Sequence, residues 1–152
     1  MSAIGDRIRD MRATAGITQS ELAVRSGISQ PKLSDYERGV ITPNPSSCER
    51  ILRELRPRPS QLLEKHADEI LVLARDHHIS RVRVFGSAVH GTDTTTSDVD
   101  LLVTFDARAS LFDLSGFANA AEDLLGYPVD VVSDAMPPNR IMDRIVAEAV
   151  PL

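Results

Sequence analysis

The sequence predicts an α plus α/β architecture: an all-α domain followed by a small domain that contains a mixed sheet. Three observations lead to this prediction. Apolar residues repeat at helical spacing over residues 1–57. Two prolines in the run Arg56–Ser60 cannot continue a helix, so a domain boundary is expected there. Beyond it, from residue 62 to 152, short alternating strand patterns lie between helical ones.

The composition is that of a folded, water-soluble protein. Of the 152 residues, 42% are hydrophobic and 26% are charged. No apolar run approaches the roughly 18 residues that a membrane helix needs, and the N-terminus lacks the continuous apolar stretch of a signal peptide. Cys48 is the single cysteine, so no internal disulfide can form. We therefore expect a cytoplasmic protein with no membrane partner.

Charge is distributed unevenly along the chain. Residues 1–60 contain ten Lys and Arg against seven Asp and Glu, a net charge of +3. Residues 61–152 contain seven against fifteen, a net charge of −8, and the two halves sum to the −5 of the whole chain. A basic half suits a phosphate backbone, whereas an acidic half needs cations before it can hold another anion.

Four helices are expected in the first domain. The first ends at Gly16, and Thr18 with Glu21 forms a capping box for the second. Ser29 is expected to cap a third helix over residues 30–38, which Gly39 closes. A fourth helix is predicted from Ser46 or Ser47 to Leu55. The second and third helices, joined by a tight turn that contains glycine, have the helix-turn-helix pattern.

The motifs Thr18–Ala23, Gly27–Gln30 and Leu33–Gly39 resemble the phage-repressor (Xre/Cro) family over nearly the whole segment. The resemblance implies binding to operator DNA, commonly as a dimer on paired half-sites. It also implies that Arg12 and Glu37 form a buried ion pair between the first and third helices, and that Tyr36 belongs to the core. The residues it places against DNA are Gln19, Ser29, Gln30, Pro31, Lys32 and Asp35.

Acidic residues interrupt the predicted strands of the second domain. After one long helix over residues 60–77 comes a strand over 81–85, and Asp98 and Asp100 lie in a second strand over 98–105. Two residues apart in a strand, they share one face at about 7 Å. Carboxylates so placed need a cation, and Mg²⁺ prefers oxygen ligands. Asp130, in a third strand over 129–132, is expected to be a further metal ligand or a base.

A Gly-Ser turn follows the first strand. Gly86 allows the backbone to approach a phosphate, and Ser87 can begin a short helix whose free N–H groups attract anions. Later in the domain, a helix is expected over residues 111–125. A last helix is expected to start at Pro137-Pro138, with Ile141, Ile145 and Val146 facing inward.

The segment Phe85-Gly86-Ser87, followed after ten residues by Asp98-Val99-Asp100, resembles the signature of minimal nucleotidyltransferases in the polymerase-beta superfamily. The resemblance covers about residues 62–152. It implies that Gly86 and Ser87 hold a nucleoside triphosphate and that Asp98, Asp100 and Asp130 bind Mg²⁺ and catalyse NMP transfer, with ATP as donor. Minimal nucleotidyltransferases are typically antitoxins paired with a HEPN-domain toxin, so a homodimer or a hetero-oligomer with such a toxin is expected.

One departure from the family pattern concerns the loop after Gly86-Ser87. The family often has arginines there, whereas this chain has Ala88 and His90. The loss removes fixed positive charge that would stabilise phosphate. Two alternatives therefore stay open: a transcriptional regulator whose degenerate second domain binds only nucleotide or a partner, and an enzyme that modifies a small molecule or RNA.

Overall fold

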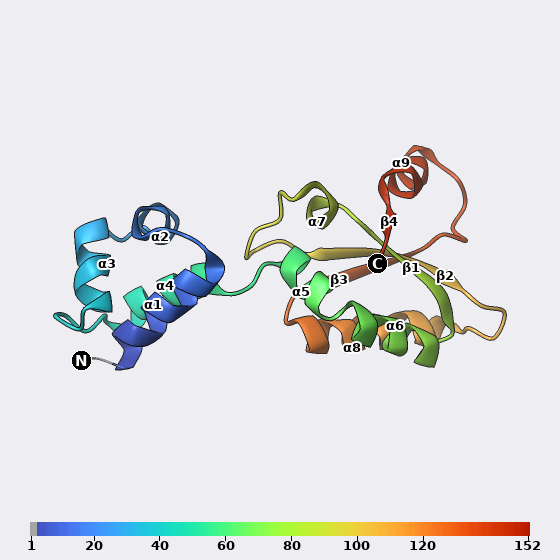
Figure 1. Ribbon diagram of the computed structural model, residues 1–152. Coiled ribbons are helices and arrows are strands. Elements are labelled where there is room, and N and C mark those ends of the chain that lie inside the picture. Colours follow the sequence, from blue (N-terminus) through green and yellow to red (C-terminus); the bar gives the residue numbers. More distant parts are fainter. Residues whose placement is uncertain (1–2) are drawn as a thin grey trace. The chain divides into compact units, whose positions relative to one another are not determined.

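A computed structural model describes residues 3–152 of the chain, which fold as two compact units (Figure 1). The first unit ends at Pro57 and the second begins at Arg58. Each unit has its own cluster of buried apolar side chains.

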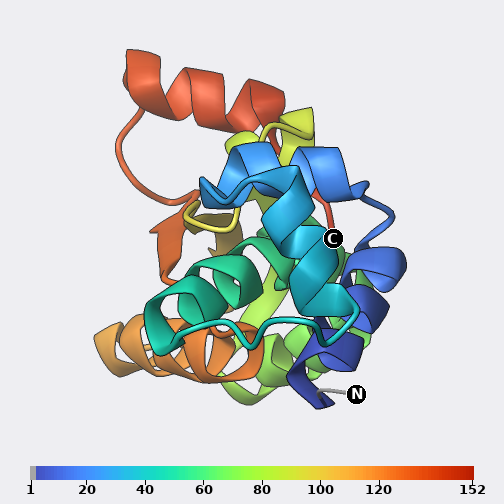
Figure 2. The same cartoon turned by 90° about the vertical axis from the view of Figure 1, so that its left-hand side faces the viewer.

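The first unit is a bundle of four helices, α1 to α4, whose packing is visible in Figure 2. Their bounds are α1 Ala3–Ala15, α2 Gln19–Ser26, α3 Gln30–Glu37 and α4 Pro45–Leu55. Side chains from all four helices meet in one core. The largest fully buried members are Ile8, Leu22, Leu33, Tyr36 and Ile51. The core position predicted for Tyr36 is therefore confirmed.

The helix caps of this unit agree with the sequence prediction only in part. The Thr18 capping box is confirmed: its hydroxyl accepts from the Glu21 amide at 3.1 Å, and the Glu21 carboxylate accepts from the Thr18 amide at 2.8 Å. Ser29 occupies the N-cap of α3 but makes no capping hydrogen bond, contrary to expectation. Helix α4 begins earlier than predicted, because Asn44 accepts from the Ser47 amide at 2.8 Å and caps it.

A mixed four-stranded sheet forms the centre of the second unit, in the order β3-β2-β1-β4. The strands are β1 Ile79–Phe85, β2 Val99–Phe105, β3 Val129–Ser133 and β4 Val150–Pro151. Strand β1 pairs antiparallel with β2 and β4, and β2 pairs parallel with β3. The predicted mixed sheet is confirmed.

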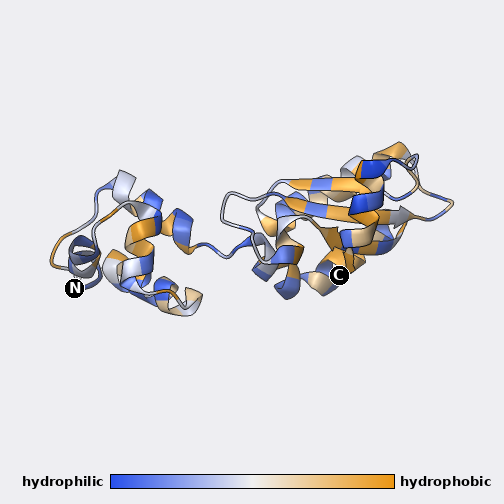
Figure 3. Cartoon of the chain, turned by 90° about the horizontal axis from the view of Figure 1, so that it is seen from above, coloured by the Kyte–Doolittle hydropathy of each residue, from blue (hydrophilic) through white to orange (hydrophobic). Residues whose placement is uncertain are grey.

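Helices cover the sheet unequally (Figures 1 and 2). Helices α5 Pro59–Lys65, α6 Ala67–Asp76 and α8 Leu111–Leu125 lie on one face, while α9 Arg140–Glu148 lies on the opposite side. The short helix α7, Ser87–His90, follows the end of β1. Alternate strand residues such as Val82, Val99 and Leu101 point into the core that α6 and α8 cover. In Figure 3, hydrophobic stretches of the strands are interrupted by hydrophilic ones.

The prediction of a single helix over residues 60–77 is wrong. Two helices, α5 and α6, meet at His66, whose φ of −109° and ψ of 17° are not helical. The His66 amide still donates to Leu62 and its carbonyl still accepts from Ile70, both at 2.9 Å. Because the hydrogen bonding continues through the bend, the apolar spacing carries no sign of it.

The inward face predicted for the last helix is wrong at Ile141 and Val146, whereas Ile145 is half-buried. Helix α9 begins after Asn139 rather than at the prolines, since the Asn139 side chain accepts from the Met142 amide at 2.9 Å. Met142 is the buried residue of this helix, whereas Ile141 and Val146 are 70% and 46% exposed. Met142, Ile145 and Glu148 share one face at helical spacing, and this face, not that of Ile141, turns toward the domain.

No helix in the described range, residues 3–152, combines the length and apolar character needed to span a bilayer.

Candidate functional site

Strand β1 ends in a sharp turn at Gly86. Its φ of 77° and ψ of −154° are essentially restricted to glycine. A Cβ at this position would lie 2.2 Å from Oδ2 of Asp100. The sequence suggests glycine here for the approach of a phosphate. The structure adds a second cause, since the Asp100 carboxylate already lies against the backbone of the turn.

Asp100 and Asp130 are neighbours on adjacent parallel strands. In the register of β2 and β3, Asp100 pairs with Asp130. Val99 and Leu101, which flank Asp100, are fully buried in the core. Because strand residues alternate between faces, both aspartates point to the face opposite that core. Asp98 precedes β2 instead of lying in it as predicted.

Electrostatic coupling links these carboxylates. Burial raises the pKa of Asp100, and the negative charges of Asp130, Asp98 and Glu148 raise this pKa further. The structure thus brings the three predicted aspartates near one another, and a fourth carboxylate joins them. The negative charge of these carboxylates attracts cations to the site.

Glu148 is the site residue that sequence reasoning missed. Its Oε1 accepts a hydrogen bond from the Gly86 amide at 2.8 Å and lies 2.9 Å from Nε2 of His90. Glu148 ends α9, directly before the segment that pairs with β1 at Val84. The pairing of chain segments more than sixty residues apart brings it here, and no local motif signals that.

Ser87 directly follows Gly86 and has an unused hydroxyl. It is the first residue of α7, and its carbonyl accepts from the Thr92 amide at 3.1 Å. Within the described part of the chain, its hydroxyl and its amide make no hydrogen bond. These donors are free for an anion.

The donor set fits a hard divalent cation. The carboxylates of Asp98, Asp100 and Asp130 supply oxygen ligands, which Mg²⁺ prefers. Among residues 3–152, however, no three His, Cys, Asp or Glu side chains are already gathered around a common point. Coordination of Mg²⁺ by these aspartates stays a prediction.

The residues predicted to contact DNA gather on α3 and the start of α2. Ser29, Gln30, Pro31 and Lys32 are exposed. Gln30 donates to Oε1 of Gln19 at 2.9 Å. The remaining member, Asp35, is half-buried and paired with Arg38. These residues form one polar surface; its contact with DNA is untested.

The ion pair expected between α1 and α3 is present. Nε and Nη2 of Arg12 donate to the two carboxylate oxygens of Glu37 at 2.6 and 2.9 Å. Gln19 donates to the same carboxylate at 2.8 Å. Burial acts to raise the pKa of Glu37, but hydrogen bonds from Arg12 and Gln19 outweigh it, and the pKa is lowered. Glu37 of α3 thus connects α1 to the start of α2.

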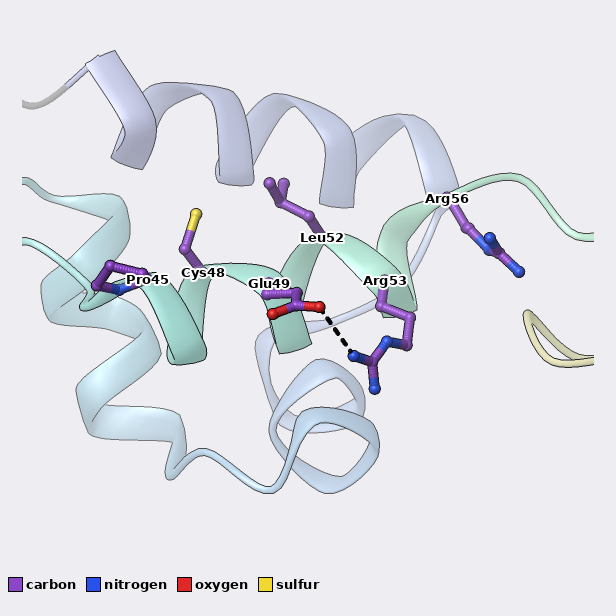
Figure 4. Close-up of a pocket in the computed structure, with 6 residues that line it drawn as sticks. All are labelled: Pro45, Cys48, Glu49, Leu52, Arg53 and Arg56. Carbon is purple, nitrogen blue, oxygen red and sulfur yellow. Dashed lines mark hydrogen bonds and ion pairs between the residues drawn. The ribbon is translucent and has the colours of Figure 1, made fainter. Parts of the chain in front are cut away.

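A shallow groove runs along α4 (Figure 4). Its lining side chains come from one helix and the residue after it: Pro45, Cys48, Glu49, Leu52, Arg53 and Arg56. Glu49 pairs with Arg53 at 3.4 Å. The Cys48 thiol lies among these lining residues, none of which is a histidine.

Comparison with known proteins identifies both units. Residues 63–150, more than half of the chain, match the nucleotidyltransferase domain family. The chain belongs to this nucleotidyltransferase family. Residues 3–58 match a helix-turn-helix domain family. The predicted combination of a helix-turn-helix with a minimal nucleotidyltransferase domain is therefore confirmed.

Similar proteins divide between the two units. The nucleotidyltransferase unit resembles "Putative protein adenylyltransferase MJ0435" of Methanocaldococcus jannaschii, with 35% identity over 54% of this chain and 88% of that protein. A solved structure described as "Structure of putative minimal nucleotidyltransferase" shares 38% identity, with a TM-score of 0.56 over 61% of this chain and 95% of that one. The other unit resembles "Uncharacterized HTH-type transcriptional regulator Rv0474" of Mycobacterium tuberculosis, with 44% identity over 34% of this chain and 37% of that protein.

Proposed function

We propose that this protein is an autoregulating antitoxin that transfers AMP from ATP to a partner toxin and binds its own operator DNA. The observation that carries the enzymatic half is the register of Asp100 with Asp130 on adjacent strands, beside the turn at Gly86. Membership of the nucleotidyltransferase family supports it, as does similarity to a protein named as an adenylyltransferase.

The chemistry assigned to the site is displacement at the α-phosphorus of ATP. A hydroxyl oxygen of the acceptor forms a bond to that phosphorus, the bond to the bridging oxygen of the β-phosphate breaks, and pyrophosphate leaves. Asp130 takes the proton of the acceptor hydroxyl. Ser87 donates its hydroxyl and amide to the triphosphate.

Asp98, Asp100 and Asp130 are the residues that would hold Mg²⁺. When bound, Mg²⁺ neutralises phosphate charge and stabilises the charge that develops on the leaving group. Burial, and then repulsion from Asp130, Asp98 and Glu148, raises the pKa of Asp100, and a shared cation would relieve that repulsion.

The partner we propose is a HEPN-domain toxin encoded by the neighbouring reading frame, with a tyrosine hydroxyl as acceptor. The polar surface of α3, with Gln30 and Lys32 exposed, supports operator binding by the same protein or by its complex with the toxin. Such coupling would let the complex repress its own synthesis.

Labelled ATP tests the enzymatic half. Purified protein is mixed with the neighbouring gene product, Mg²⁺ and ATP carrying label on the α-phosphate. We expect label on the partner with wild-type protein and none with Asp98→Ala plus Asp100→Ala. Asp123→Ala, an exposed aspartate on α8, is the matched control and should behave as wild type.

A second candidate function is neutralisation by binding alone, in a regulator whose second domain does not turn over. The loop favours it, because Ala88 and His90 occupy positions where an arginine would stabilise phosphate, and the His90 ring contacts Glu148. Equal neutralisation of the toxin by wild type and by the double aspartate variant, without label on the partner, would establish this second function.

A further inference from the structure

One carboxylate oxygen touches both ends of helix α7. Oε1 of Glu148 accepts from the amide of Gly86, the residue before α7, and lies 2.9 Å from the ring of His90, its last residue. A helix of four residues is too short to be stable without help from its surroundings. The contacts of Oε1 of Glu148 therefore help to stabilise α7.

The turn at Gly86 also needs external restraint. Glycine populates many backbone conformations, so its φ of 77° and ψ of −154° must be selected by neighbours. Two neighbours do so from different directions. The carboxylate of Asp100 lies against the Cα of Gly86, and that of Glu148 binds its amide.

The fold supplies Glu148 at a defined place. Val150, two residues later, pairs with Val84, which is two residues before Gly86. Met142 anchors the other end of α9, at 7% exposure. The Glu148 side chain is accordingly held from both directions along the chain, and its distance from the turn is set by strand pairing.

We propose that Glu148 is a positioning residue: by accepting from the Gly86 amide, it holds the Gly86–Ser87 turn in the shape that receives the triphosphate. This inference rests on the proposed function for the identity of the ligand. Because Glu148 uses the Gly86 amide, the hydroxyl and amide of Ser87 are left for phosphate. Without Glu148 the turn loses one of its two restraints before nucleotide arrives, and ordering it then costs binding free energy.

The alternative role for a carboxylate at this place is that of an internal anion that competes with phosphate. Two variants separate the roles, because both lack the charge and only one lacks the acceptor. Glu148→Gln keeps a carbonyl oxygen for the Gly86 amide, whereas Glu148→Ala removes it. His90→Ala removes the second contact and leaves the Gly86 hydrogen bond in place.

Hydrogen exchange of the Gly86 amide, measured by NMR without nucleotide, tests the hydrogen bond directly. We expect protection in wild type and in Glu148→Gln, and exchange at least about tenfold faster in Glu148→Ala. Circular dichroism verifies that each variant is folded. Equal protection of the Gly86 amide in Glu148→Ala and wild type would overturn the inference.

Binding of ATP with Mg²⁺, measured by calorimetry, tests the consequence. Glu148→Ala should bind about 3- to 10-fold more weakly than Glu148→Gln, which corresponds to the loss of one hydrogen bond. Binding by Glu148→Ala as tight as or tighter than that by Glu148→Gln would overturn positioning, and tighter binding by both variants than by wild type would identify a competing anion. If wild type binds no ATP, the proposed function fails, and the exchange of the Gly86 amide still decides whether Glu148 holds the turn.

Discussion

At the scale of single residues, the site depends on close contacts that leave no room for substitution. Gly86 is confined by the Asp100 carboxylate, 2.2 Å from the position a Cβ would take. Gly91, at the other end of α7, has a similar positive φ of 67°, but a Cβ there would meet no atom within 4 Å. Gly86 therefore combines a backbone conformation essentially restricted to glycine with a collision, whereas Gly91 has an ordinary left-handed backbone and no collision.

We predict that Gly86→Ala destabilises the protein more than Gly91→Ala does. A left-handed backbone, as at Gly91, costs a non-glycine residue about 1–2 kcal/mol. At Gly86 the backbone conformation costs at least as much, and a forced collision adds about 1–3 kcal/mol. Gly91→Ala should show the first cost alone. Chemical denaturation followed by circular dichroism measures both, and equal losses would contradict the contact with Asp100. Gly86→Ala should also reduce ATP binding, since the Asp100 carboxylate must move.

At the scale of elements, an ion pair inside the first unit adds to its apolar core in joining the helices. Glu37 of α3 is 4% exposed and accepts from Arg12 of α1 and from Gln19 of α2. Helices of 8 to 13 residues have little stability alone, so contacts of this kind determine how they assemble.

We predict that Arg12→Ala lowers the free energy of unfolding of the first unit by about 1.5–3 kcal/mol. The substitution removes the charged donor of the buried Glu37 carboxylate. Arg53→Ala is the matched control, since Arg53 pairs with Glu49 at the surface of the same unit. Its effect should stay below about 1 kcal/mol. Urea denaturation of the two variants makes the comparison, and similar losses would refute a special role for Glu37.

The same ion pair predicts a pH dependence. The folded-state pKa of Glu37 is lowered from 4.5, so its contribution to stability is fully present above pH 4.5 and is lost as pH falls through the folded value. Glu37→Gln removes this contribution. Between pH 6 and pH 3, we therefore expect wild type to lose more stability than Glu37→Gln does, as measured by urea denaturation. Parallel pH profiles would contradict the assignment.

At the scale of the whole molecule, two separate cores imply two separable activities. Ile8, Leu22 and Ile51 belong to the first core, and Val99 and Phe117 to the second. Each core is complete within its own unit. Substitutions at one site should accordingly leave the fold of the other unit unchanged.

We predict that Gln30→Ala with Lys32→Ala weakens retention of the operator in a gel shift and leaves binding of ATP unchanged. Both side chains are exposed on α3, so the fold should tolerate their loss. Lys65→Ala, an exposed lysine of the second unit, is the control for loss of one positive charge. Unchanged retention by the double variant would refute the assignment of α3 to DNA contact.

Local patterns in the sequence determined most of the elements. The Thr18 capping box and the apolar repeats of the first unit are short-range signals, and both are found as predicted. The strand predicted around Asp100 is also present, but it begins at Val99 and leaves Asp98 outside. The turn at Gly86 and the helix that Ser87 begins were also visible from the chain alone. Such features depend on neighbours within a few residues, which a sequence displays directly.

Tertiary structure alone decided the features that depend on distant segments. The inward face of α9 and the place of Glu148 arise from packing and strand pairing across the second unit. The bend at His66 is likewise not visible in the apolar spacing of residues 60–77. Asp100 meets Asp130 because β2 and β3 pair in a particular register, and periodicity within one strand does not specify its partner. Hydrogen bonds and core contacts between remote segments select among alternatives that are locally equivalent.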